Sequence, residues 1–332
     1  MPSGRVDMET ALTLSLAGLL ESGTPTFVLI DPLLGEPIPV EQVTGIELSG
    51  LTQVREQAWM RPVHTIKLAR TIALPVHQHP YLVELQGRGD PKLAETMEIA
   101  CEELAQTWAD GLASSGAAPH RIGGWLQSSL SADDLTQALS AMMRVNTEAI
   151  APARYQRLAD RRALGWLRHV VGDERVAAQF GRIQSWRYLD TGGQLAQLRS
   201  AGEVASPLRL TYSEWALFMK GELLHPTVAR WLGERALRPA SGGATTPDER
   251  ACYLQASAAL ERAEAAARRW PQRFVKPSDR VAWAALVLLH PNIEQSPKVA
   301  TALNEPAAPG EPIETLDALS PMLSAMCLKA TP

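Results

Sequence analysis

Three aspartates that each follow a strand-like run are the residues whose types and positions suit chemistry. Asp31 ends the apolar run from residue 26, Asp160 lies in a short charged segment, and Asp190 follows the run from residue 183. Sites of α/β sheets usually form at the carboxyl ends of the strands, where carboxylates can act as acids or bases. One hypothesis is therefore a hydrolase-like or metal-dependent enzyme that uses these strand-end carboxylates.

The residues around Asp160 argue against an acid–base role for it. Arg157, Arg161 and Arg162 lie within three residues of this carboxylate. Neighbouring cations favour the charged form of a carboxylate and lower its pKa. We expect Arg157, Asp160 and Arg162 to form an ion-pair brace that holds the turn between a strand and a helix. The other interpretation is that they orient a partner-binding surface.

Histidines supply the best metal candidate in the sequence. His77 and His79 would lie on one side of a strand, and His64 could add a third ligand. However, Pro75 and Pro80 flank the pair and indicate an irregular loop, and no acidic or cysteine partner has ligand spacing nearby. We therefore expect a surface loop, with no metal and no cofactor.

Common catalytic signatures are absent from the sequence. It contains no Gly-x-x-x-x-Gly-Lys-Ser/Thr, no Gly-x-Gly-x-x-Gly, no Gly-x-Ser-x-Gly and no Cys-x-x-Cys. This absence favours a protein that is not an enzyme.

Arginine is concentrated between residues 151 and 200. This segment has nine arginines, no lysine and four acids, a local charge of +5 in a chain whose net charge is −4. Nucleic-acid binding would require stacking aromatics in the same patch, but Trp166 and Trp186 fit helix-face and strand-core positions better. A protein-docking surface and a solvated ion-pair network remain the two interpretations.

The elements that must position these residues alternate between strands and helices up to residue 190. Predicted strands cover 26–31, 81–85, 122–128 and 183–188, and predicted helices begin at Pro91, after the cap residue Ser131, and before Leu164. This alternation predicts an α/β lobe with a central sheet, whose strand order the sequence leaves open.

The remainder of the chain has a helical pattern. Thr211 and Glu214 form a predicted capping box, and helices are expected at 248–269, from Pro277, and at 316–328. Residues 239–247 are an expected linker, and 304–313 an expected loop. We therefore predict an α/β lobe at 1–193 and an all-α lobe at 194–332.

The order of motifs in the first lobe is similar to that of a known family. Gly-Trp-Leu-x-Ser-Ser from Gly124, a capped helix, Arg-x-x-Asp-x-Arg from Arg157, a helix and Gly-x-Ile-x-x-Trp ending at Trp186 follow one another. This order resembles the adaptor, or effector-loading chaperone, family of bacterial type VI secretion. The resemblance covers roughly residues 26 to 232, and it includes the first strand, which ends at Asp31.

The motif departs from the family pattern, which reads Arg-aromatic-aromatic-Asp-Pro-Arg. Leu158 and Ala159 replace the aromatics, and Arg161 replaces the proline. These departures predict a looser turn than in typical members of the family.

The resemblance also implies a function. A member of this family would be a cytoplasmic chaperone without enzymatic activity that holds a toxic effector and delivers it to a VgrG-type spike. The α/β lobe would contact the spike and the helical lobe the effector. Within the helical lobe, we expect Trp231, Trp270 and Phe274 to be effector-binding anchors, because large apolar groups dominate interfaces. An equally weighted alternative is that they pack the core of their own lobe.

Bulk properties agree with an intracellular protein. The 332 residues are 45% hydrophobic and 20% charged, which is ordinary for a globular chain long enough for two domains. Three widely spaced cysteines favour a reducing compartment. Asp7 and Glu9 precede the apolar run 11–20, where a signal peptide would be basic, and no run is long enough to span a membrane. We expect a cytoplasmic protein that binds neither nucleic acid nor membranes.

Overall fold

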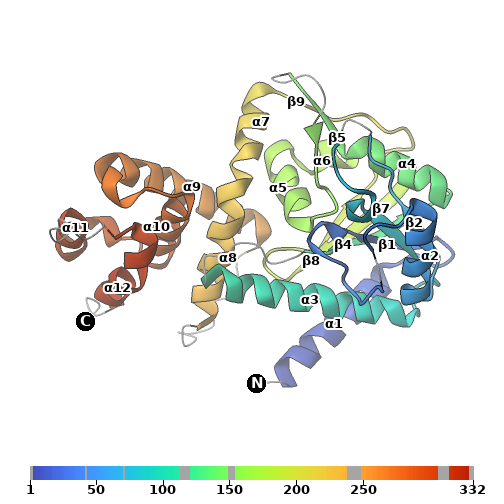
Figure 1. Cartoon of the computed structure of the whole chain (residues 1–332), viewed down its shortest axis with the longest axis horizontal. Helices are drawn as coiled ribbons and strands as arrows, with labels where there is room; N and C mark the ends of the chain where they lie inside the picture. Colours follow the sequence, from blue (N-terminus) through green and yellow to red (C-terminus); the bar gives the residue numbers. More distant parts are fainter. Residues whose placement is uncertain are drawn as a thin grey trace. The chain divides into compact units, whose positions relative to one another are not determined.

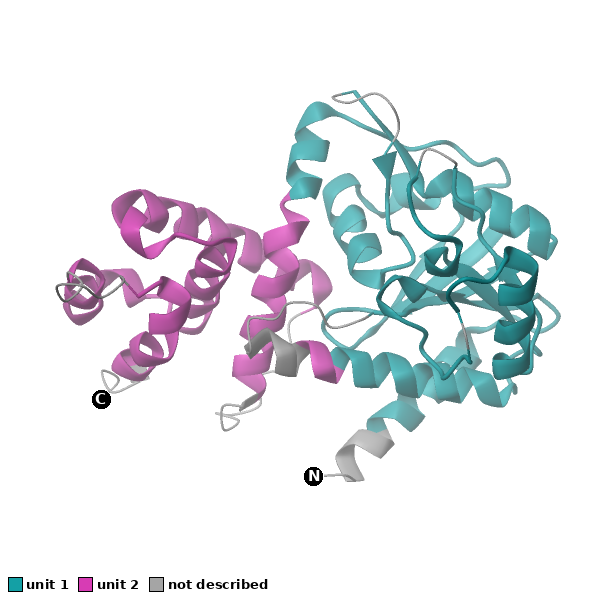
Figure 2. Ribbon diagram, viewed as in Figure 1, with its two compact units in different colours: residues 1–104, 119–219 teal, residues 105–118, 220–332 magenta. Residues whose placement is uncertain are grey.

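The computed structural model describes residues 3–41, 43–69, 72–112, 120–148, 154–237, 248–305 and 314–328. It divides the chain into two compact units (Figure 2): residues 1–104 with 119–219, and residues 105–118 with 220–332. The first unit is α/β and the second is mostly helical, so the predicted fold class is confirmed. The expected linker at 239–247 and residues 306–313 of the expected loop lie outside the described residues.

A six-stranded sheet organises unit 1 (Figure 1). In spatial order its strands are β2 (Val63–Thr65), β3 (Tyr81–Leu85), β1 (Thr26–Ile30), β4 (Ile122–Ser128), β7 (Ile183–Leu189) and β8 (Leu195–Arg199). Every neighbouring pair is antiparallel. The two central strands, β1 and β4, are buried along their whole length, which explains their nearly continuous apolar sequence.

Helices pack on both faces of this sheet. The helices of unit 1 are α1 (Ser3–Leu19), α2 (Leu48–Trp59), α4 (Ala132–Met142), α5 (Arg161–Val171), α6 (Asp173–Ala177), α7 (Tyr212–Met219) and most of α3 (Pro91–Leu112), with the short 3-10 turns η1 (Pro32–Leu34) and η2 (Val76–Gln78). Apolar residues of α4, α5 and α6 share one core with Leu126 and Trp186. On the opposite face, Trp125 donates to Thr96 of α3 over 3.0 Å.

Unit 1 also contains a small second sheet, whose strands lie between and after those of the main sheet in the sequence. It consists of β6 (Arg154–Tyr155), β5 (Arg144–Thr147) and β9 (Arg209–Leu210). After β9, Thr211 and Glu214 exchange hydrogen bonds of 2.9 and 3.2 Å. The predicted capping box is thus present at the start of α7.

The boundary of the first unit lies later than the sequence predicted. Gly192 and Gly193 belong to a hairpin turn and not to a break between lobes, since Asp190 N–H donates to Gln194 C=O over 2.8 Å. Gly193 has φ +81, a conformation that glycine adopts readily. The turn returns the chain as β8, so the predicted boundary after residue 193 moves to Met219.

Unit 2 is built from α8 (Gly221–Leu237), α9 (Glu249–Arg269), α10 (Pro277–Leu289), α11 (Pro297–Asn304) and α12 (Leu316–Leu328), with the short turns η3 (Pro271–Arg273) and η4 (Ile293–Gln295). The central helix α10 packs against α8, α9 and α12. Buried Arg273 donates to four carbonyl oxygens, those of Ala302, Leu303, Glu305 and Glu314. It thereby joins the segments before and after residues 306–313. None of the helices within the described residues is long and apolar enough to cross a membrane.

Two glycines let other backbone segments approach β4. A Cβ on Gly123 would lie 2.4 Å from Ala159 O, and one on Gly124 would lie 2.3 Å from Arg187 O. Gly124 also has φ +130, which side chains other than glycine rarely adopt. Trp186 fills the space beside this pair and donates from Nε1 to Gly123 O over 3.1 Å.

We predict that Gly124→Ala destabilises unit 1. The strained φ alone should lower the free energy of unfolding by about 1–3 kcal/mol, and the clash with Arg187 O adds to this. Gly89→Ala is the control, because nothing lies within 4 Å of its Cβ position and its φ is not positive. Denaturant unfolding of both variants measures the difference, and equal stability would contradict the close approach.

Candidate functional site

Asp31 stands at the end of β1 and is buried against an arginine. Its Oδ2 accepts from Arg157 Nε over 2.5 Å, and its Oδ1 accepts from Leu33 N–H over 3.0 Å, which caps η1. The same guanidinium places Nη1 3.5 Å from Asp160 Oδ2. Arg157 therefore bridges two carboxylates that are far apart in the sequence.

Asp160 begins α5 as its N-cap residue. Its Oδ1 accepts from the backbone N–H and from Nε of Arg162, both over 3.0 Å, and its Oδ2 accepts from Arg162 Nη2 over 2.7 Å. An acid at this position satisfies free N–H groups of the first turn and complements the helix dipole. The structure thus brings together Asp31, Arg157, Asp160 and Arg162, a set that we call the strand–helix brace.

A second cluster joins the brace to α3 through Arg161. Arg161 is buried and donates to Ala100 O over 2.8 Å and to Ile122 O over 3.1 Å. Its Nη1 also lies 3.3 Å from Glu103 Oε2. Glu103 in turn accepts from the backbone N–H and Nε of Arg121, both over 2.9 Å. Arg161 therefore has a structural role, since it connects the start of α5 to α3 and β4.

A third group lies under the loop after β1. Glu36 accepts from Arg55 Nη2 over 2.7 Å and from Tyr81 Oη over 2.6 Å. Tyr81 accepts from Trp59 Nε1 over 3.1 Å. Arg121 Nη1 donates to Glu36 O over 2.9 Å, which links this group to the second cluster. The charged residues of the second cluster and of this third group are therefore hydrogen-bonded within unit 1.

Burial and neighbouring charges shift the pKa values of Asp31 and Asp160 in opposite directions. Burial raises the pKa of Asp31 above its ordinary value, against the opposing effect of Arg157. Burial also disfavours the charged form of Asp160, but Arg162, with smaller contributions from His120 and Arg157, holds its pKa well below the ordinary value. Asp160 is thus an anion at neutral pH, which suits a cap and an ion pair and not a general acid.

The strand-end carboxylates do not form a catalytic set in this geometry. Asp31 and Asp160 are both held by arginine. Asp190 Oδ1 instead accepts from the N–H groups of Gly192 and Gln194, over 2.9 and 2.8 Å, in the hairpin turn. Because the main sheet is wholly antiparallel, the rule for parallel sheets that motivated the enzyme hypothesis does not apply.

The three histidines considered as ligands have other contacts. His64 Nε2 lies 3.5 Å from Glu84 Oε2, and His79 Nε2 lies 3.2 Å from Leu74 O. His77 belongs to the short turn η2. Within the described parts of the chain, no group of three or more His, Cys, Asp or Glu residues could hold a metal ion.

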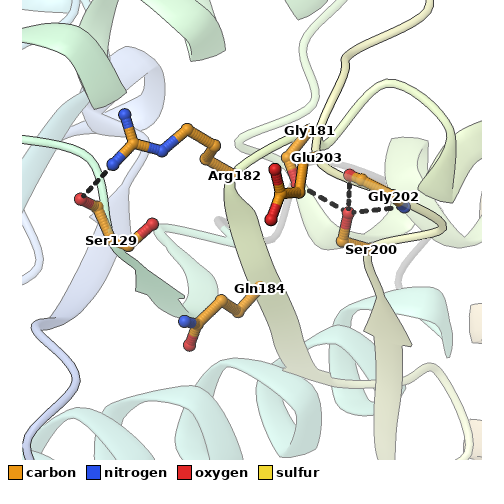
Figure 3. A pocket seen from close by; sticks show the side chains of 7 residues that line it. All are labelled: Ser129, Gly181, Arg182, Gln184, Ser200, Gly202 and Glu203. Atoms are coloured by element: carbon orange, nitrogen blue, oxygen red, sulfur yellow. Dashed lines mark hydrogen bonds between the residues drawn. The ribbon is translucent and has the colours of Figure 1, made fainter.

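A polar hollow of about 690 Å³ lies where β7 begins and β8 ends (Figure 3). Its lining residues are Ser129, Gly181, Arg182, Gln184, Ser200, Gly202 and Glu203. Ser200 Oγ lies within 2.6 Å of Gly181 O and 2.7 Å of Gly202 O, and Arg182 Nη2 donates to Ser129 O over 3.2 Å. The serine thus holds the backbone in place and is not activated as a nucleophile.

The three expected effector anchors are buried. Trp231, Trp270 and Phe274 are only 4%, 3% and 7% exposed. Trp270 and Phe274 both pack edge-on against Trp283, with ring centroids 6.0 and 6.3 Å away. These side chains therefore pack a core, and the prediction that they are surface anchors is replaced by the alternative stated with it.

Several residues of the site were not predicted from the sequence, although two carried a signal. Arg55 lies four residues from both Leu51 and Trp59, on the buried stripe of α2. Glu103 lies three residues after Ala100 on the buried side of α3. A charged residue at the spacing of an apolar stripe indicates a buried ion pair, because such a charge is costly without a partner.

Comparisons with known proteins identify no relative. No protein-family model, no curated protein and no solved structure matches the chain. Functional interpretation therefore depends on the contacts above and on the motif order of the sequence.

We predict that Asp160→Ala destabilises unit 1 by roughly 3–5 kcal/mol, because it removes a buried carboxylate from two partly buried arginines, Arg157 and Arg162. Asp173→Ala is the matched control: Asp173 also pairs with an arginine, Arg168, but its side chain is 59% exposed. Such surface pairs contribute at most about 1 kcal/mol. Urea unfolding compares the variants, and similar losses for both would show that the brace is not buried in solution.

The pH dependence of Asp160 gives a separate prediction. Its folded pKa is depressed below the ordinary 3.8, so the unfolded chain takes up a proton first as the pH falls. The stability that Asp160 contributes should therefore be complete above about pH 5 and should decline below the ordinary pKa. We expect the stability difference between the wild type and Asp160→Asn to shrink in that acidic range. A difference that stays constant down to pH 3 would contradict the shift.

Proposed function

We propose that the chain is a non-enzymatic adaptor of bacterial type VI secretion that holds a toxic effector and loads it onto a VgrG-type spike. The observation that carries this proposal is the strand–helix brace. The charged residues of the family-like motif, Arg157, Asp160 and Arg162, fix the start of α5 to the end of β1. In a protein that acts by binding partners, we expect the charged residues of such a motif to stabilise the fold and not to catalyse a reaction.

The competing enzyme hypothesis finds less support. A hydrolase-like or metal-dependent enzyme would need a carboxylate able to exchange a proton, or a set of metal ligands. Asp160 is held as an anion by Arg162, both oxygens of Asp31 accept from Arg157 and Leu33 N–H, and the described residues offer no cluster of metal ligands. We therefore propose no cofactor. We also propose that the adaptor acts in the cytoplasm.

The adaptor hypothesis divides the work between the two units. The sheet of unit 1 commits its strands to one another and gives a rigid body for docking on the spike. Unit 2 is proposed to hold the effector through exposed apolar side chains on its helices and their connections, because burying such side chains against a partner is favourable. Leu254 and Val275, 53% and 68% exposed, take the place of the three buried residues as candidate anchors.

We predict that Leu254→Asp and Val275→Asp, combined in the full chain, reduce effector capture by about tenfold or more while spike capture persists. The experiment is a low-salt pull-down with the spike and toxin encoded by neighbouring genes in the native genome. Val204→Asp is the control, because Val204 is 87% exposed and lies in unit 1.

Two results would count against the adaptor. Recovery of neither partner by the wild-type chain would overturn the proposed function itself. Loss of effector capture in the control but not in the double variant would reverse the proposed division of labour.

A further inference from the structure

The outer edge of β8 is an open edge of the main sheet. β8 runs from Leu195 to Arg199 as the last strand, it contains no proline, and its register with β7 is unbroken. These are the properties of an edge to which another strand can add, since proline, bulges and very short length normally prevent such addition.

Hydrogen-bond alternation identifies the groups that face outward. Asp190 N–H bonds to Gln194 C=O at one end of the β7–β8 pair, and Ser200 N–H bonds to Gln184 C=O at the other. Between these ends, bonded and non-bonded pairs alternate in an antiparallel ladder. Leu195, Gln197 and Arg199 therefore direct their N–H and C=O groups away from β7, and no hydrogen bond from any described residue reaches those groups.

The opposite edge of the sheet differs. On β2, Val63 N–H donates to Glu56 Oε1 over 3.3 Å. Just beyond that strand, Lys67 C=O accepts from Ser140 Oγ over 2.6 Å. Side chains of α2 and α4 thus occupy outward groups of the β2 edge, whereas the β8 edge has no such cover among the described residues.

The β8 edge also carries positive charge. Gln197 lies between Arg187 and Arg199, and its amide oxygen, turned toward them, accepts from both over 3.1 Å. Arg187 is fully buried on β7, where its guanidinium also donates to Leu19 O, Gln127 Oε1 and Ser185 Oγ, whereas Arg199 is exposed at the edge. Glu21 attracts Arg187, yet within the described residues neither arginine forms an ion pair with a carboxylate. A neutral amide is a weaker acceptor than a carboxylate, so a carboxylate of a partner would bind the exposed Arg199 more strongly than Gln197 does.

We propose that β8 receives an extended acidic segment of a partner protein as a seventh strand, with a carboxylate of that segment facing the exposed Arg199. Main-chain hydrogen bonds to residues 195, 197 and 199 would supply affinity, and the charge would supply specificity. A second copy of β8 fits less well, because it would gather the arginines of both copies on one sheet without a carboxylate. The proposal depends on this strand alone and not on the secretion role.

The test uses the full chain and two synthetic peptides, one of alternating threonine and glutamate and one of alternating threonine and lysine. Threonine favours the extended conformation. Fluorescence anisotropy measures binding, and hydrogen–deuterium exchange measures protection of residues 195–199. We expect the acidic peptide to bind and to slow exchange over this segment, and the basic peptide to do neither.

Three variants make the test specific. Gln197→Pro removes an outward N–H that the β7 pairing does not use, and Arg199→Glu reverses the charge; each should weaken binding by about tenfold or more. Gln197→Ala keeps the outward N–H and should retain binding. If the proline variant does not fold, Arg199→Glu with its ordinary fold still decides the matter.

The proposal fails if the acidic peptide does not bind, if both peptides protect β8 equally, or if Arg199→Glu leaves binding unchanged. A dimer of the chain alone that Gln197→Pro abolishes would also overturn it, in favour of self-pairing. None of these outcomes bears on whether the chain captures a spike or an effector in pull-downs.

Discussion

The contact between Arg157 and two carboxylates is the interaction on which the geometry of unit 1 depends. Asp31 closes β1 and Asp160 opens α5, and one guanidinium lies between them. A buried anion costs several kcal/mol without a partner, and Asp31 and Asp160 are both buried, so neither element can move away from Arg157 without leaving a carboxylate less well paired. The sheet and the helix layer are therefore joined by charge at this point as well as by apolar packing.

Close packing at the same point explains the small residues of the motif. Ala159 and Leu158 are buried, and Ala159 O comes so near to β4 that only glycine fits at residue 123. Aromatic side chains at 158 and 159 would require a different approach of this turn. Arg161, in place of proline, compensates by donating to Ala100 O and Ile122 O. The sequence predicted a looser turn, but hydrogen bonds and close packing hold this turn from several sides.

Helices and strands with a clear hydrophobic period could be predicted from the sequence, but the pairing of the strands could not. The apolar run of β1, the helical stripe of α3 and the cap at Ser131 are local patterns, and the structure places an element at each. The hairpin to β8 escaped prediction because Gly192-Gly193 marks equally well a turn within a sheet and a break between lobes. The antiparallel order depends on contacts between distant segments, such as β1 with β4, which periodicity does not encode.

The site shows the same division between local and distant information. The spacing of Arg157, Asp160 and Arg162 was visible, whereas their link to Asp31 and the roles of Glu103 and Arg121 depend on the fold. Tryptophans were harder to place, because one side chain serves a core or an interface equally well. Trp231 and Trp270 are buried, and nothing in their local sequence distinguishes them from surface anchors.

The two units also contain joints of different chemical kinds. In unit 1 the brace uses two carboxylates, and Asp31, whose pKa is raised by burial, takes up a proton before Asp160 as the pH falls. In unit 2, Arg273 joins the segments on either side of residues 306–313 through carbonyl oxygens, which stay unprotonated over the same range. Acidification therefore weakens one joint and spares the other. A fall in pH would weaken the Asp31–Arg157 contact of the strand–helix brace first, while Asp160 stayed an anion and the Arg273 joint kept its hydrogen bonds.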